Sequence, residues 1–277
     1  MGKRILLVLI TLMLVFSISA CSPSADPGAG PGADPGADPG DVETVAAGKF
    51  TVGFDQDFPP MGFVGDDGEF TGFDLELAAE VADRLGLELV LQPIAWDAKD
   101  MELSTKNIDC IWNGFTINGR EDQYTWTDPY MSNNQVFVVR ADSGITNLDD
   151  LAGKTVMAQV DSSADKALEG RPDLKDTFGD YLTAADYNTA LMELESGAVD
   201  VVAMDDTFAN YYIAIKGDNL VVLDETLSPE DYGVGFLLGN EVLRDTVQAT
   251  LEAMADDGTM AAISEKWFGK DITTIGK

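Results

Sequence analysis

A loop near the middle of the chain combines the groups that bind a carboxylate. Arg120 closes the sequence Asn-Gly-Phe-Thr-Ile-Asn-Gly-Arg at residues 113–120. A guanidinium can bind both oxygens of a carboxylate, while the threonine hydroxyl and the backbone amides supply further donors. An isolated arginine more often forms a surface ion pair, and here 17 Lys and Arg face 49 Asp and Glu. The hypothesis of a carboxylate site therefore depends on what surrounds this loop.

Polar residues also stand at the ends of other predicted strands. They are Asp55 and Asp57 after strand 50–54, Asp161 to Ser163 after strand 155–159, and Asp205 and Asp206 after strand 199–204. In open parallel sheets, ligands bind beyond the carboxyl ends of the strands, so these residues and the 113–120 loop can meet. Each aspartate or serine alone can be explained as a helix N-cap, and Asp57 is best explained that way. Together with Arg120 they predict a shared binding site.

Alternating strands and helices are predicted around these loops. The predicted strands cover 50–54, 87–91, 108–112, 155–159, 199–204 and 220–223, with a hairpin at 61–73. The predicted helices cover 74–85, 97–105, 163–168, 187–196, 207–216, 240–256 and 259–267, and Asp74 is expected to cap the first. Strand–helix–strand repeats predict an α/β fold with parallel sheets covered by helices on both faces.

Two further predicted strands, 135–140 and 232–238, bracket a segment with its own strands and helices. If that segment is a lobe inserted into the first, these strands are the crossovers between the lobes. From residue 49 onward about 230 residues remain, which is enough for two modest domains. We therefore predict a first lobe of residues 49–138 and 232–277, and a second lobe of residues 139–231.

The N-terminus has the pattern of a targeting segment. Lys3 and Arg4 precede an apolar run at 5–18, which is shorter than the ~20 residues of a membrane-spanning helix. The sequence Ile-Ser-Ala-Cys then ends at Cys21 and resembles the lipobox of bacterial lipoproteins. An ordinary secretory signal or an uncleaved anchor is the alternative. We predict a signal peptide at 1–20, lipidation of Cys21, and a location outside the cytoplasm at the cell membrane.

Residues 22–41 repeat the tetrapeptide Ala-Asp-Pro-Gly three times and contain no apolar residue larger than proline. Such a segment cannot bury enough apolar surface to offset the entropy of ordering the chain. We predict that residues 21–48 comprise the lipidated cysteine and a disordered tether. A structured Pro/Gly domain is the alternative.

Composition excludes several functions. The formal net charge of −32 argues against nucleic acid as a partner, because phosphate binding needs clustered Lys and Arg. The chain has no histidine, so histidine-based triads are excluded and zinc or iron sites are disfavoured. We expect neither a metal nor a cofactor. Cys110 lies in an apolar run and is expected to be a small core residue.

Eight segments in order resemble the polar amino-acid-binding proteins of bacterial ABC importers, which are solute-binding proteins of family 3. The segments are VGFDQDFPPMGF, GEFTGFDLELAAEVADRLG, IDCIWNGFTINGR, WTDPY, LAGKTV, LESGAVDVVAMD, YGVGF and DGTMAAISEKWFG. The resemblance covers essentially residues 49–268. It implies the two-lobed type II periplasmic-binding-protein fold, in which each lobe has a mostly parallel sheet flanked by helices and two crossover hinge strands join the lobes.

The resemblance also implies how the charged ends of an amino acid would be bound. Arg120 and Thr116 would bind the α-carboxylate, and Ser163 would donate to it from the second lobe. Asp205 would pair with the α-ammonium, with the carbonyl of Gly114 as a second acceptor. Both charges of a zwitterion would then be met only when the lobes close, and closure is what an importer would recognise.

Other positions would contact the ligand's side chain. Asp55, Phe58 and Trp96 match positions that line this part of the pocket, and Asp55 could accept from a cationic head or from a glutamine amide. Asn113 stands where family members often have a small residue, and would touch the ligand or narrow the pocket. Residues 118–119 make the turn before Arg120 one residue shorter than is common in the family.

We therefore expect a monomeric, lipid-anchored receptor that binds a free polar or basic L-amino acid and delivers it to an ABC permease. The alternative is an enzyme on the same fold, such as a dehydratase acting on a small carboxylic acid. Acid–base chemistry would have only Asp55 and Asp57 as candidates, without a histidine to assist. We therefore expect a protein that is not an enzyme.

Overall fold

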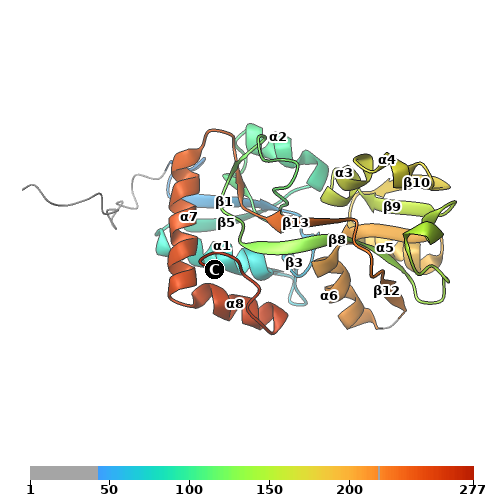
Figure 1. The fold of residues 1–277 in the computed structure, drawn as a ribbon. Helices are drawn as coiled ribbons and strands as arrows, with labels where there is room; N and C mark the ends of the chain where they lie inside the picture. The colour runs from blue at the N-terminus through green and yellow to red at the C-terminus, as the bar shows by residue number, and fades with distance from the viewer. Residues whose placement is uncertain (1–42, 218) are drawn as a thin grey trace, which may run out of the picture. The chain divides into compact units, whose positions relative to one another are not determined.

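The computed structural model describes residues 43–217 and 219–277. The predicted signal peptide, Cys21 and the predicted tether up to residue 42 lie outside the described residues. The described part forms two lobes, each built around its own β-sheet (Figure 1). None of its helices is both long enough and apolar enough to cross a membrane. The lobe boundaries and the tether stay predictions.

The first lobe is built on a five-stranded sheet in the order β5-β1-β6-β14-β7. Its strands are β1 (Lys49–Phe54), β5 (Glu88–Pro93), β6 (Cys110–Ile111), β7 (Thr125–Trp126) and β14 (Gly235–Phe236). β5 and β6 run parallel to β1, whereas β14 runs antiparallel to β6 and β7. A small antiparallel sheet joins β2 (Asp57–Phe58), β3 (Gly62–Val64) and β4 (Phe70–Thr71). The helices are α1 (Phe73–Arg84), α2 (Lys99–Ser104) after a 3₁₀ turn at Trp96–Ala98, α7 (Glu241–Asp256) and α8 (Thr259–Phe268).

Helix α1 positions a loop of the site through its first turn. The helix begins after Gly72, where a side chain would overlap the carbonyl of Met61. The prediction of Asp74 as the N-cap is wrong, because Asp74 lies inside the helix and is fully buried. Its carboxylate accepts from the Gly114 amide at 2.6 Å and from the Tyr130 hydroxyl at 2.8 Å. Asp74 thus fixes the start of the loop that carries Arg120.

The second lobe is built on a six-stranded sheet in the order β10-β9-β11-β8-β12, with β13 also paired to β8. Its strands are β8 (Met131–Arg140), β9 (Thr155–Gln159), β10 (Asp180–Ala184), β11 (Val201–Asp205), β12 (Leu220–Val222) and β13 (Ser228–Tyr232). β9, β10 and β11 are parallel, and β8 runs antiparallel to its neighbours. The helices are α3 (Ser163–Glu169), α4 (Pro172–Lys175), α5 (Tyr187–Ser196) and α6 (Asp206–Lys216), with a 3₁₀ turn at Leu148–Leu151. The predicted parallel strands are therefore present in both lobes, and antiparallel strands complete each sheet.

Strands β8 and β13 run side by side between the lobes (Figure 1). Their register places Glu230 of β13 opposite Asn133 of β8. A bridge between Thr116 and Tyr232 then ties the loop of the first lobe to the end of β13. The side chains of β8 and β13 consequently stand close to the boundary between the lobes, and β13 ends at Tyr232, where the predicted crossover strand 232–238 was expected to begin.

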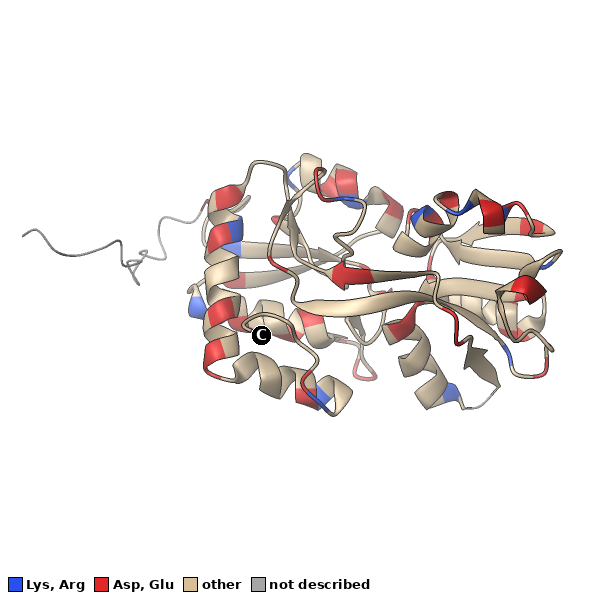
Figure 2. Ribbon diagram, viewed as in Figure 1, with Lys and Arg blue, Asp and Glu red and all other residues tan. Residues whose placement is uncertain are grey.

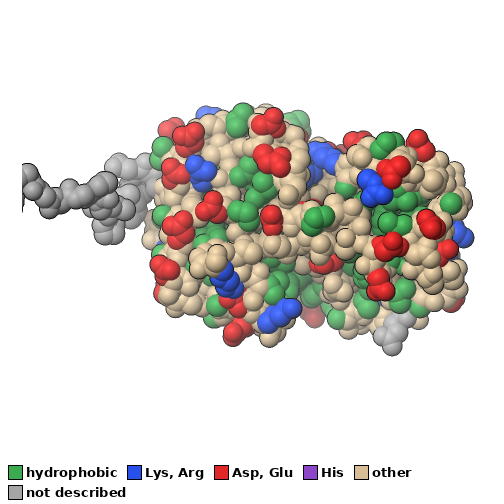
Figure 3. Space-filling model, in the orientation of Figure 1, with side chains coloured by type: hydrophobic (Ala, Val, Ile, Leu, Met, Phe, Trp, Pro, Cys, Tyr) green, Lys and Arg blue, Asp and Glu red, His purple; other side chains and the backbone are tan. Residues whose placement is uncertain are grey.

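Cys110 is a free, fully buried thiol within the core, as predicted. Burial raises its pKa well above the ordinary value, so the thiol stays protonated. Acidic residues are distributed over both lobes in Figure 2, and those on the face in Figure 3 are scattered rather than gathered. On the face shown, the acidic side chains that give the chain its negative charge are spread over both lobes and do not gather at the lobe boundary.

Candidate functional site

A small cavity lies where the two lobes meet; it is partly open to solvent, and its volume of about 20 Å³ has room for about one water molecule. Every residue predicted to contact a ligand lines it: Asp55, Phe58, Trp96, Asn113, Gly114, Thr116, Arg120, Ser163 and Asp205. Gln159 and Ser162 line it as well; sequence reasoning missed Gln159, and it named Ser162 only among the polar residues after strand 155–159, without a role in binding. Their position at the end of β9 and in the following turn is the signal that could have found them, because ligands gather at strand ends.

A tight turn presents Arg120 to the cavity. The Arg120 amide donates to the Ile117 carbonyl at 2.8 Å, and Gly119 adopts the left-handed conformation (φ 79°) that is open to glycine. The Asn118 side chain accepts from the Asp231 amide at 2.7 Å, which ties the turn to β13. Through this short turn Arg120 reaches the cavity.

The guanidinium of Arg120 is buried, with the residue only 1% exposed. It donates to the carbonyl of Thr116 at 3.2 Å and to the carbonyl of Asp161, in the second lobe, at 3.4 Å. Its Nε has no hydrogen-bond partner, and no ion pair within residues 43–217 and 219–277 includes Arg120. A buried cation without a counter-ion is unfavourable, so this guanidinium is available to a carboxylate.

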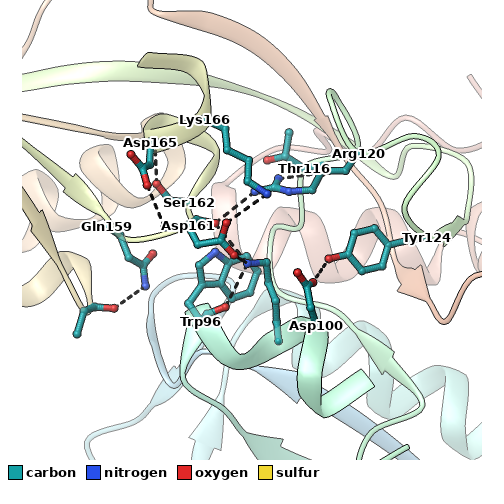
Figure 4. A network of polar contacts seen from close by, with 12 residues as sticks. Trp96, Asp100, Thr116, Arg120, Tyr124, Gln159, Asp161, Ser162, Asp165 and Lys166 are labelled. Carbon is teal, nitrogen blue, oxygen red and sulfur yellow. Dashed lines mark hydrogen bonds and ion pairs between the residues drawn. The ribbon is translucent and has the colours of Figure 1, made fainter. Parts of the chain in front are cut away.

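Asp161 connects the lobes through cations. Lys99, from helix α2 of the first lobe, is fully buried and forms an ion pair with the carboxylate of Asp161, which is labelled in Figure 4. The Lys99 ammonium also donates to the carbonyls of Trp96 at 3.2 Å and Asp161 at 3.3 Å. Lys166 pairs with the other carboxylate oxygen of Asp161 at 3.2 Å. Burial alone would raise the pKa of Asp161, but the hydrogen bonds and charges of the two lysines lower it below the ordinary value.

Asp205 ends strand β11 and has no cation beside it within the described part of the chain. Its Oδ1 accepts from the Tyr232 hydroxyl at 2.5 Å and from the Asn133 amide at 3.0 Å. Burial raises the pKa of Asp205 well above the ordinary value, and the negative charge of nearby Glu230 raises it further. An incoming cation would oppose that shift by stabilising the ionised carboxylate.

Glu230 is a buried carboxylate that sequence reasoning missed. Its Oε2 accepts from the hydroxyls of Thr116 at 2.9 Å and Ser163 at 2.6 Å, one from each lobe. Its Oε1 accepts from the amides of Asn133 at 2.6 Å and Gln135 at 2.8 Å. Four neutral donors thus surround this carboxylate. The Asn133 amide also reaches Asp205, so the two carboxylates share one donor.

Asp55 belongs to the other end of the cavity. Its carboxylate accepts from the Gln159 amide at 2.8 Å, across the lobe boundary, and from the Asp57 backbone amide at 2.9 Å. The Asp55 amide donates to the Asn113 side chain at 3.1 Å. Burial raises the pKa of Asp55 to about 6, against the opposing effect of these hydrogen bonds. At neutral pH the group is mostly ionised and can accept from a cation or an amide.

Aromatic rings form the apolar part of the cavity wall. Phe58 of the first lobe packs on Tyr187 and Phe208 of the second, with ring centroids 5.9 Å and 5.6 Å away. Trp96 meets Phe115 edge to face at 5.5 Å. These contacts favour a ligand with an apolar stem between its polar ends. No group of three His, Cys, Asp or Glu side chains that could hold a metal ion occurs in the described ranges.

Known proteins with similar sequences and structures identify the family. Residues 50–270 match bacterial extracellular solute-binding proteins, family 3. The L-cystine-binding protein TcyJ of Escherichia coli (strain K12) is 35% identical over 229 residues, covering 82% of this chain and 85% of that protein. An ABC uptake transporter substrate-binding protein of Streptococcus pneumoniae, solved with bound histidine, has a TM-score of 0.79 and 35% identity, covering 82% of this chain and 94% of that one.

A third similar structure, Tv2483 bound to L-arginine, has a TM-score of 0.80 and 27% identity, and the match covers 83% of this chain and 94% of that chain. The chain belongs to the bacterial extracellular solute-binding proteins of family 3, and it has the fold of the type II periplasmic binding proteins.

Proposed function

We propose that this protein is a receptor that binds a free L-amino acid between its lobes and delivers it to an ABC importer. The observation that carries the proposal concerns one cavity, which is lined by a buried Arg120 and a buried Asp205, neither of which has an ion pair within the described residues. A zwitterion loses its hydration on entering such a cavity, so it needs an opposite charge at each end. The relatives named for cystine, histidine and arginine binding support an amino acid as the ligand.

The α-carboxylate would bind Arg120, with hydroxyl groups of Thr116 and Ser163 beside it. The α-ammonium would bind Asp205, whose raised pKa falls when a cation arrives. Because Arg120 belongs to the first lobe and Asp205 to the second, the ligand would hold the closed arrangement together.

The ligand's side chain would be polar or basic. Phe58 and Trp96 would pack against its stem, while Asp55 and Gln159 would accept from or donate to its head. Asp57, the other residue considered for acid–base chemistry, does not line the cavity. The family and the relatives named as binding proteins support a receptor rather than an enzyme.

Attachment to the membrane would come from lipidation of Cys21, and the receptor would act as a monomer. Both proposals rest on the sequence pattern and on the family. Mass spectrometry of the mature N-terminus tests the first: a lipidated Cys21 is expected, and cleavage elsewhere without lipid would contradict it. Analytical ultracentrifugation tests the second, with a single species of monomer mass as the expected result.

Calorimetry against the twenty amino acids and L-cystine tests the central proposal. At least one polar or basic amino acid should bind, and Arg120→Met should remove that binding while the fold persists. Arg171→Met is the matched control, because Arg171 pairs with Asp173 on the exposed surface. The absence of binding by every compound would refute the proposal.

A further inference from the structure

Two hydroxyls of the proposed site donate to a carboxylate of the protein itself. Thr116 of the first lobe and Ser163 of the second both line the cavity. The Thr116 hydroxyl lies 2.9 Å and the Ser163 hydroxyl 2.6 Å from the same oxygen, Oε2 of Glu230. A hydroxyl has one hydrogen to donate, so while these bonds are made each hydroxyl offers a ligand only its lone pairs.

We propose that Glu230 is a positioning residue that takes both hydroxyl hydrogens and thereby determines what the site offers to a ligand. Thr116 and Ser163 then act on Glu230, and the guanidinium of Arg120 is the side-chain donor for the ligand's carboxylate. The family resemblance implied instead that both hydroxyls help to bind that carboxylate. The part of the inference that concerns a ligand rests on the proposed function, whereas the contact between the lobes at Glu230 does not depend on it.

The fold holds the Glu230 carboxylate in one orientation. Its other oxygen, Oε1, accepts from the amides of Asn133 at 2.6 Å and Gln135 at 2.8 Å, both on β8, the strand that pairs with β13. With one oxygen facing these two donors, the second oxygen is left for the hydroxyls. Glu230 is 4% exposed, and a buried carboxylate that loses a donor is destabilised. Both hydroxyls are therefore held on Glu230.

One oxygen of Glu230 also joins the two lobes. Thr116 is tied to the end of β13 by its bridge to Tyr232, while Ser163 is the first residue of α3 in the second lobe. Whichever lobe β13 follows when the lobes separate, one of the two hydroxyls must leave Glu230. The closed arrangement alone satisfies both bonds, so they favour closure with or without a ligand.

Asp205 keeps a different role beside Glu230. The Asn133 amide donates to Asp205 at 3.0 Å as well as to Glu230, so the two carboxylates form one buried group, the Asp205–Glu230 pair. No Lys or Arg within residues 43–217 and 219–277 forms an ion pair with either of them. Asp205 lines the cavity and Glu230 does not. Glu230 thus orients the hydroxyls, while Asp205 faces the space that a ligand would enter.

The contact between the lobes is tested without any ligand. Ser163→Ala removes the hydroxyl of the second lobe, so the lobes of the empty protein should lie further apart on average. Fluorophores on Met192→Cys and Val242→Cys in the Cys21→Ser protein report this separation, because both positions are exposed and each lobe carries one. Ser163→Thr keeps a hydroxyl and should restore the wild-type separation.

The matched control is Ser132→Ala. Ser132 is an exposed serine of β8 that donates to the carboxylate of Asp231 on β13 at 2.8 Å, so it also joins a hydroxyl to a carboxylate of that strand but does not reach across the lobes. Its loss should leave the separation unchanged. An unchanged separation in folded Ser163→Ala protein, or an equal change in both variants, would overturn the inference.

Affinity shows which partner the hydroxyl serves. The probes are L-arginine, L-histidine or L-cystine, whichever binds the wild type in calorimetry, and the same molecule with each α-carboxylate replaced by a carboxamide. Ser163→Ala should weaken binding of both compounds by the same factor, about tenfold, because closure becomes less favourable for either. Arg120→Met should instead remove the preference for the carboxylate.

A loss in Ser163→Ala that is about tenfold or more larger for the amino acid than for its carboxamide would show that the hydroxyl donates to the ligand, and would overturn the inference. If no amino acid binds the wild type, it is the proposed function that fails. In that case, or where the carboxamide binds too weakly to measure, the separation of the lobes decides about Glu230.

Glu230→Gln should reverse the pattern. The new amide oxygen should face the donors of Asn133 and Gln135, so its NH₂ group donates to the two hydroxyl oxygens and their hydrogens become free for a ligand. In this background Ser163→Ala should cost the amino acid about tenfold more affinity than its carboxamide. Equal losses in folded Glu230→Gln protein would show that Glu230 does not hold the hydrogens, and thermal unfolding checks the fold of each variant.

Discussion

Two carboxylate clusters at the boundary between the lobes differ in how their charge is balanced. The Asp161 cluster consists of Asp161, Lys99 and Lys166, which hold one another in ion pairs. The Asp205–Glu230 pair is surrounded by neutral hydroxyl and amide donors. The lysines lower the pKa of Asp161 despite its partial burial, whereas burial and mutual repulsion raise the pKa of Asp205.

The difference separates structural charge from charge reserved for a ligand. The Asp161 cluster is complete without a ligand and joins helix α2 of the first lobe to the turn before α3 of the second. The Asp205–Glu230 pair lacks a cation, which a buried carboxylate needs. We infer that the first cluster supports closure of the lobes and that the second responds to the ligand. Carboxylates with perturbed pKa values in a cleft are typical of functional sites. Of the two clusters, the Asp205–Glu230 pair is the one whose charge is left for a ligand to balance.

The largest effect is expected at the pair. Asp205→Asn should weaken binding of the amino acid by about 100-fold, because the ammonium loses the buried carboxylate proposed to pair with it. The fold should persist, since an amide can keep the hydrogen bond from Tyr232. Calorimetry measures the affinity and thermal unfolding checks the fold. Binding within threefold of the wild type would remove Asp205 from the site.

Asp55 is another buried carboxylate without an ion pair among the described residues, and its effect on the free energy of unfolding extends the comparison. Its pKa of about 6 in the folded protein lies above the ordinary value of 3.8, so ionisation above pH 6 destabilises the fold. That destabilisation disappears as the pH falls from 8 toward 4. Asp55→Asn should therefore raise the free energy of unfolding by about 2 kcal/mol at pH 8, after allowing for weakened hydrogen bonds, and by little at pH 4. Urea denaturation at both pH values measures this, and an equal change at both would contradict it.

Breaking the Asp161 cluster should open the lobes. Lys99→Met fills a fully buried position with an apolar side chain, so the fold should hold. Affinity should fall about tenfold, because a smaller fraction of the empty protein is closed. Fluorophores on cysteines at Met192 and Val242, one in each lobe and both exposed, report the separation of the lobes. Cys21→Ser removes the other predicted reactive thiol, and Cys110 is buried. An unchanged separation and affinity would show that the Lys99 ion pair does not support closure.

The smallest effect is expected at the exposed side of the same cluster. Lys166 is 38% exposed, so its ion pair with Asp161 is screened by solvent and contributes at most about 0.5 kcal/mol. Lys166→Met should change affinity less than about threefold at physiological salt. If Lys166→Met lowered the affinity as much as Lys99→Met does, the burial of Lys99 would not explain why its ion pair with Asp161 matters more for binding.

The sequence predicted regular elements well where local signals agree. Helix α5 was predicted at its observed bounds because apolar residues recur at helical spacing and Gly197 ends it in the left-handed conformation. Strand β9 was also predicted at its observed bounds. Strand β13 was missed, since Ser-Pro-Glu-Asp-Tyr shows no apolar alternation and its pairing with β8 is long-range.

All the residues that the family resemblance predicted to contact a ligand line one cavity. The resemblance did not predict Lys99 and Glu230, the buried charged residues that contact the residues of this site. Lys99 and Glu230 are ordinary surface types by composition, and only the meeting of the two lobes buries them. Asp74 was misjudged because its helix-start position suggested a cap, while the first lobe buries it and uses it to hold Gly114. Burial that arises between distant segments leaves no periodic trace in the sequence.

The most direct measurement compares an amino acid with its deaminated form. Calorimetry would use whichever of L-arginine, L-histidine or L-cystine binds the wild type, and the same molecule with hydrogen in place of the α-ammonium. Asp205→Asn should weaken binding of the amino acid by about 100-fold and leave the already weak binding of the deaminated form unchanged within about threefold. An equal loss for both compounds would contradict the assignment of Asp205 as the partner of the ammonium.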